Sequence, residues 1–279
     1  MDRICDIVGP VPRPCWICGE PSDSREHKIK RSDIVREFGT GAFTEDGGLV
    51  HCIDGYQPRV LQGPNSDFLK YVPVICRRCN SNRSQPWDKA YTDFLTWVFE
   101  NRDLVFARRC VNLFEVFGER DAIHAATNLY KYFVKAFGCR LASAGHPVPE
   151  HLVALLSHRR FRTKLRLTFA IYKAVFALGS EFRQRACLSP LDISDDWGME
   201  HFEQCFFRLN IGWLIIGWNY DIEAAREDGA PWSCDAPIIS IGEIEGPTLD
   251  KLIAGARRSD APALPDLEAM RNAGGIRIG

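Results

Sequence analysis

The pattern of apolar and polar positions divides the chain into three regions of different character. In residues 1–95 the apolar stretches are short, as at residues 71–75, and Cys, Gly and Pro residues separate them. This texture predicts a small domain with little regular structure. Its apolar core is too small to order it alone, so we expect a metal ion to order it. A glycine-rich stretch at residues 39–48 predicts a loop or an irregular hairpin between the two halves of this domain.

The second region, residues 96–190, is expected to be mainly helical. Apolar residues recur at helical spacing here, and the stripe from Ile123 to Phe137 predicts one helix that ends at Gly138. Residues 150–158 predict a short helix, and residues 160–180 predict a longer one.

The third region, residues 191–279, is expected to be rich in strands. Residues 201–220 and 236–245 combine Phe, Ile, Trp and Val with nearby turn-forming residues, which is typical of strands. The segment beyond residue 255 is expected to be a flexible tail. Together the three regions predict an α+β fold.

Charge and length exclude some classes of function. The formal net charge of -1 gives no overall attraction to nucleic acid, so such binding would depend on local basic patches. No apolar run reaches the roughly 18 residues that span a bilayer, so no membrane association is expected. The first fifteen residues do not resemble a secretory signal, and the eleven cysteines are an odd number, which favours reduced thiols and a cytoplasmic location.

Two CxxC pairs are the strongest chemical signal in the sequence. Cys15 and Cys18 form the first pair, and Cys76 and Cys79 form the second. Four thiolates make the closed tetrahedral set that is typical of a structural Zn²⁺. The segment between the pairs is longer than in a simple zinc ribbon, which indicates an insertion. The alternatives are free thiols or a redox-active pair, but neither pair lies in a thioredoxin-like βαβ pattern.

The residues around these pairs resemble a known family. The dipeptide Glu26-His27 follows the first pair, and Asn80 follows the second pair at once. This order resembles the four-cysteine class of HNH endonucleases. The resemblance covers the N-terminal region alone. It implies that a β-hairpin and a helix form a zinc-bound ββα-metal module there.

The resemblance also implies a reaction and assigns roles to residues. His27 would be the general base that activates water, and Glu26 with Asn80 would bind a catalytic Mg²⁺ or Mn²⁺. The expected activity is therefore metal-dependent hydrolysis of phosphodiester bonds, with DNA as the expected substrate. Two departures stand out. Glu26 replaces the usual Asp, and the middle Asn is absent, since Asn65 lies too far upstream of the second pair.

Basic residues near His27 supply the expected contacts to nucleic acid. Lys28, Lys30 and Arg31 follow His27, and Arg83 lies three residues beyond Asn80. Lysine and arginine side chains in such a cluster are suited to phosphate groups.

Several alternatives remain open at the level of sequence. Asn80 could simply cap a helix that begins after Cys79. The whole protein could be a non-catalytic adaptor that binds nucleic acid or protein through a zinc-stabilised module. A homo-oligomer, an activating partner, and a setting in phage defence or a mobile element are all compatible with the resemblance.

Overall fold

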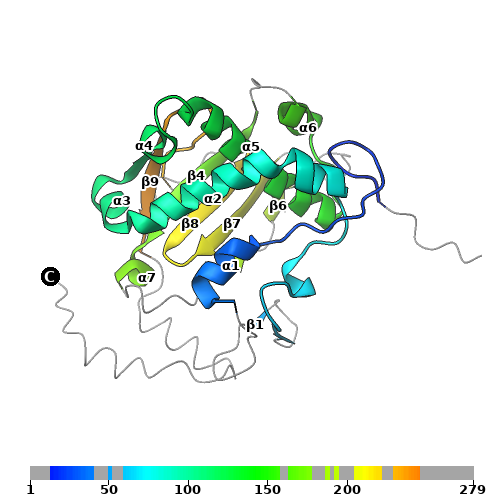
Figure 1. Ribbon diagram of the computed structural model, residues 1–279, viewed down its shortest axis with the longest axis horizontal. Helices are drawn as coiled ribbons and strands as arrows, with labels where there is room; N and C mark the ends of the chain where they lie inside the picture. The colour runs from blue at the N-terminus through cyan, green and yellow to red at the C-terminus, as the bar shows by residue number, and fades with distance from the viewer. Residues whose placement is uncertain are drawn as a thin grey trace, which may run out of the picture.

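The computed structural model describes residues 13–40, 50–51, 59–157, 163–177, 186–188, 192–194, 204–221 and 229–245, which Figure 1 draws in colour. Most of the expected glycine-rich loop at residues 39–48 and the whole of the expected tail lie outside these ranges. In the described part of the chain, no helix is long and apolar enough to cross a membrane.

A seven-stranded mixed sheet forms the centre of the described structure. Its strand order is β3-β9-β4-β8-β7-β5, and β6 also pairs with β7. Only the β4–β9 pair is parallel among the described pairs. The bounds are β3 Cys110–Asn112, β4 Leu165–Tyr172, β5 Ala186–Leu188, β6 Asp192–Ser194, β7 Gln204–Ile211, β8 Leu214–Tyr220 and β9 Ile238–Ile244.

Two long helices, α2 (Gln85–Glu100) and α5 (Ala122–Ala144), pack together across one face of this sheet (Figure 1). The Phe94 ring of α2 meets the Phe169 ring of β4 edge to face, with ring centroids 5.7 Å apart. On β8, the indole N–H of Trp218 donates to the carbonyl of Phe133 in α5 at 3.0 Å. Shorter helices are α3 Arg102–Arg108, α4 Leu113–Phe117, α6 Glu150–Ser157 and α7 Lys173–Ala177.

The N-terminal part consists of extended segments and short helices that lead into α2. Residues 24–28 run antiparallel to residues 69–75, with bridges between Ser24 and Ile75 and between His27 and Lys70. The chain then turns through the π-helix η2, which continues into α2. The remaining elements are α1 Arg31–Phe38, β1 Val50–His51, β2 Arg59–Val60, the 3₁₀-helix η1 Asp67–Leu69 and η2 Arg78–Arg83.

The expected strands are confirmed. Residues 204–220 form the β7–β8 hairpin, which turns at Gly212 with a φ of 53°, and β9 lies within the expected residues 236–245. The short helix at 150–158 is α6. The α+β class is confirmed in its broad form, since helices and a mixed sheet coexist. The sheet takes strands from both sides of residue 190, so the second and third regions share one core.

Two expectations for the middle region are wrong. Residues 165–172 form β4 rather than part of a long helix. The run Leu165-Arg166-Leu167-Thr168-Phe169 alternates with a period of two, and a buried strand and a buried helix are hard to distinguish in so apolar a stretch. In addition, α5 continues through Gly138 to Ala144. It ends at Gly145, which has a φ of 91°.

Gly138 lies inside α5 because an aromatic ring occupies the space that a side chain would need. A Cβ atom at this position would lie 2.5 Å from ring atoms of Trp16, which belongs to the first CxxC pair. The Trp16 indole N–H also points to the sulfur of Cys139, at 3.4 Å. The first cysteine pair is therefore docked directly onto α5.

This contact reverses the usual effect of replacing a helical glycine. Gly to Ala inside a helix normally stabilises by about 1 kcal/mol. We expect Gly138→Ala to destabilise the protein by about 1–3 kcal/mol through overpacking, measured by denaturant unfolding. In a Trp16→Ala background, the same substitution should stabilise. A gain in stability from Gly138→Ala in the wild-type background would contradict the packing described here.

Candidate metal centre and the His27 site

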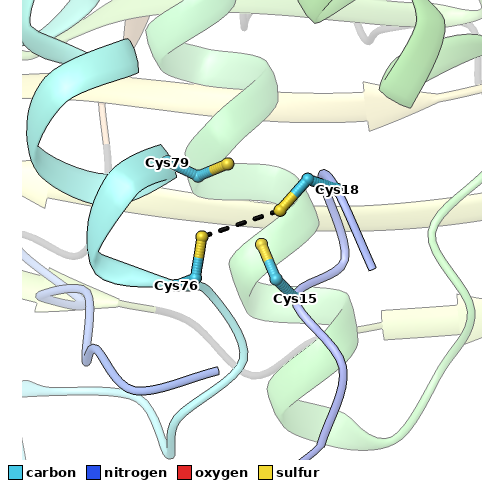
Figure 2. A group of neighbouring side chains, drawn as sticks. All are labelled: Cys15, Cys18, Cys76 and Cys79. Atoms are coloured by element: carbon cyan, nitrogen blue, oxygen red, sulfur yellow. Dashed lines mark hydrogen bonds between the residues drawn. The ribbon is translucent and has the colours of Figure 1, made fainter. Parts of the chain in front are cut away.

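The four paired cysteines converge on one point. The Sγ atoms of Cys15, Cys18, Cys76 and Cys79 all lie within 4.8 Å of one another, as Figure 2 shows. The Cys18 and Cys76 sulfurs are 3.6 Å apart. A tetrahedral zinc with bonds of about 2.3 Å places its sulfurs about 3.8 Å apart, so the cluster has the size of a zinc site. It could hold a metal ion such as zinc.

Local backbone geometry places the sulfurs. The first pair sits on a tight turn, in which the N–H of Gly19 donates to the carbonyl of Cys15 at 2.8 Å and Gly19 takes a φ of 79°. The second pair sits where the chain enters η2, so Cys76 and Cys79 lie one helical turn apart. The two pairs thus join the start of the described chain to the start of the α2 helix.

The thiols perturb one another. Burial and the neighbouring thiols of Cys18 and Cys15 raise the pKa of Cys79. Although burial opposes it, hydrogen bonds from the Cys79 backbone and the Cys18 thiol lower the pKa of Cys76. Four sulfurs this close do not all ionise without a cation among them, and a bound metal ion supplies that charge.

Glu26 lies in a buried ion network. Its carboxylate Oε1 is 3.2 Å from the Nζ of Lys135 on α5, and the two side chains are only 14% and 1% exposed. The same ammonium is 3.0 Å from Oδ1 of Asp88 on α2. Burial raises the pKa of Glu26, and the charge of Lys135 opposes that rise. Burial alone would lower the pKa of Lys135, but Glu26 and Asp88 raise it, so it stays an ammonium.

His27 faces different neighbours from Glu26. Successive side chains of an extended segment point to opposite sides. Burial lowers the pKa of His27, and the charges of Lys70, Arg31 and Arg25 lower it further. The ring hydrogen-bonds the backbone of Pro64. Its Nε2 atom is buried and has no hydrogen-bond partner among the described residues.

Asn80 ties the helix start to the first extended segment. Its amide Nδ2 donates to the hydroxyl of Ser24 at 2.9 Å, and its backbone N–H donates to Cys76 at 2.9 Å. Asn80 thus lies inside η2 and is not the residue that caps it, which is Arg77. Its Oδ1 atom is buried without a partner in the described part of the chain.

The expected nucleic-acid contacts have varied surroundings. The Lys30 ammonium donates inward to the Asp88 carbonyl at 2.6 Å and to the Thr92 hydroxyl at 3.0 Å. Arg31 is exposed, and its Nε donates to Asn65 at 3.0 Å.

The other two expected contacts lie nearer to α5 and α6. Burial, with Arg140 and Arg25 nearby, lowers the pKa of the half-buried Lys28. Arg83 donates to the hydroxyl of Ser157 at 2.7 Å. Lys28, Arg31 and Arg83 therefore leave some positive charge at the surface. The Lys30 ammonium instead makes its hydrogen bonds inside the protein.

The residues expected to hold Mg²⁺ or Mn²⁺ do not fit an ion bound by Glu26. That carboxylate already has an ammonium at 3.2 Å. Among the described residues, the four cysteines are the only group of three or more His, Cys, Asp or Glu side chains close enough to share a metal. Asn80 offers one neutral oxygen. No catalytic step is therefore assigned to a divalent ion at Glu26.

Neither Lys135 nor Asp88 is among the site residues that the sequence predicts. The only signal for Lys135 was a lysine flanked by apolar residues, in the run Phe133-Val134-Lys135-Ala136-Phe137.

Comparisons with protein-family models, with curated proteins and with solved structures found no match.

The cysteine cluster leads to a direct measurement. We expect the purified protein to contain one zinc per chain by elemental analysis, and Cys18→Ser or Cys79→Ser to lose it and to unfold at a lower temperature, since metal binding contributes folding free energy. Cys110→Ser, which changes a partly exposed thiol of β3, is the control and should keep the zinc. Equal zinc content in all variants would contradict the assignment.

The surroundings of His27 lead to a pH prediction. Its folded pKa is lowered, so the unfolded state binds the proton more tightly. Above about pH 6.5 the ring is neutral in both states and costs no stability; as the pH falls from about 6.5 to the folded pKa, stability is lost. NMR titration of the His27 ring should give a midpoint below 6.5, and Lys70→Met should raise it. Lys89→Met, which changes an exposed residue of α2, should leave it unchanged. An unmoved midpoint in Lys70→Met would show that Lys70 does not act on the ring.

Proposed function

We propose that the protein hydrolyses phosphodiester bonds, most simply those of DNA, with His27 as the general base. The observation that carries this proposal is the His27 ring itself, whose buried Nε2 has no partner among the described residues, while burial and the charges of three cationic side chains lower the pKa of the ring. A buried polar atom without a partner in a native structure calls for a water molecule, an ion or a functional role.

The arrangement suits a base. A ring N–H that donates to the Pro64 carbonyl leaves the other ring nitrogen as the acceptor, and the proposal takes Nε2, which has no partner among the described residues, as that acceptor. Burial and then the cationic neighbours lower the pKa of the ring, so it is neutral and able to accept a proton near pH 7. In the reaction, Nε2 takes a proton from water as the water oxygen attacks phosphorus, the bond to the leaving oxygen breaks, and solvent protonates that oxygen.

The same cations have a second role in this proposal. Lys70, Arg31 and Arg25 would attract the phosphate backbone and offset the negative charge that develops on phosphorus-bound oxygens. Arg25 and Lys70 also contact the carboxylate of Asp67, at 2.7 Å and 3.7 Å. This pairing holds Arg25 and Lys70 near the ring.

The second candidate function is a non-catalytic adaptor with a zinc-stabilised fold. The contact between Glu26 and Lys135 favours it, because the acidic member of the expected Glu–His pair is then occupied within the protein. In this case the cationic face around His27 would bind nucleic acid without cutting it.

Cleavage of supercoiled plasmid and single-stranded DNA separates the two functions. We expect wild-type protein to cut, and His27→Ala to be slower by about 10²–10⁴-fold, the usual contribution of a general base. Assays run with Mg²⁺, with Mn²⁺ and with a weak chelator that spares the zinc. His124→Ala is the matched control, since it removes an exposed histidine from α5.

Each outcome assigns a function. Cleavage by wild type and by His124→Ala, with much slower cleavage by His27→Ala, supports the hydrolase. Binding of DNA without cutting by any variant supports the adaptor. Equal cutting by wild type and His27→Ala would exclude His27 as the base.

A further inference from the structure

Lys135 is the most deeply buried cationic residue among the described residues. Its side chain is 1% exposed and lies on α5 between carboxylates from two other segments, Glu26 and Asp88. Removing an ammonium from water is costly unless it is paired and hydrogen-bonded. A lysine at this position therefore requires both carboxylates.

The network around Lys135 is balanced in charge. The ammonium of Lys30 lies 3.6 Å from the same Asp88 carboxylate, so two cations face two anions. The hydroxyl of Ser84 completes the set, 3.4 Å from the Lys135 Nζ and 2.8 Å from Asp88 Oδ2. A divalent cation added here would leave two unbalanced positive charges in a buried site.

We propose that Lys135 is the resident cation of Glu26 and Asp88, so that Glu26 is a positioning residue and binds no divalent ion. The ammonium fixes the extended segment that carries Glu26 against α5 and thereby sets the position of the adjacent His27. The inference deepens the proposed function, but its contacts exist whether or not the protein cuts nucleic acid.

The position of Lys135 within α5 supports this role. One turn further along the helix, Gly138 and Cys139 receive the Trp16 ring from the first cysteine pair. The same side of α5 thus contacts the cysteine cluster through Trp16 and the extended segment through Glu26. The N-terminal segment therefore contacts α5 at two neighbouring places, by an ion pair at Lys135 and by aromatic packing at Gly138.

Binding of Mn²⁺ tests the proposal in the zinc-loaded, full-length protein. Free Mn²⁺ is measured by electron paramagnetic resonance with wild type and with Glu26→Gln, which keeps the shape of the side chain but removes its charge. The proposal expects identical Mn²⁺ binding by the two proteins. A single Mn²⁺ site in wild type that Glu26→Gln abolishes would overturn it.

A second variant tests the role of the ammonium. Lys135→Ala leaves Glu26 and Asp88 facing each other, and we expect its unfolding temperature to fall by roughly 6–20 °C. Mn²⁺ at saturating concentration should then restore roughly 5–10 °C, because the two carboxylates gain a cation. Adding Glu26→Gln to this variant should abolish the Mn²⁺ effect. Lys131→Ala, one turn earlier on α5, is the matched control and should show no Mn²⁺ effect.

A merely structural lysine would not give this pattern. If Lys135→Ala unfolds at the wild-type temperature and does not respond to Mn²⁺, Lys135 is not the cation of this site. If Lys135→Ala does not fold without Mn²⁺ but folds with it, the proposal is supported, and the comparison of wild type with Glu26→Gln stands on its own. None of these readouts depends on cleavage, so failure of the proposed hydrolysis leaves them unaffected.

Discussion

Lys135 carries a charge into the interior, and the free energy cost of taking that charge out of water must be offset by Glu26 and Asp88. Those two carboxylates come from the extended segment beside the cysteine cluster and from α2. Because the Lys135 ammonium must be paired, it holds together α5, α2 and the extended segment that carries Glu26. The cluster of cysteines, the segment with His27 and the long helices on the sheet then have little freedom to shift against one another.

The cysteine cluster was predictable because the spacing within each CxxC pair is a local property, and four thiolates have few alternatives to metal. The strands β7, β8 and β9 were predictable for the same reason, since each alternates or is continuously apolar over a short range. The ion network was not predictable. A lysine and two acids separated by many residues become a unit only through tertiary packing, and the sequence around Lys135 shows only an isolated charge.

The errors have physical causes as well. The alternation of residues 165–169 gives way to the apolar run Phe169-Ala170-Ile171, and such a run does not distinguish a buried strand from a buried helix. Gly138 indicated a helix end because glycine is common there, whereas its missing side chain makes room for the ring of Trp16. In both cases a partner distant in sequence decided the outcome.

The docking of Trp16 on Gly138 has a consequence for the order in which the protein is made. The segment that carries the two cysteine pairs is synthesised before α5, the helix that receives it, which ends at Ala144. Strand β4, whose Phe169 ring meets Phe133 of that helix, and the later strands of the sheet follow after it. The Trp16 ring therefore lacks its docking site until α5 has been made, and a metal ion held by the four cysteines would order the segment around that ring before then.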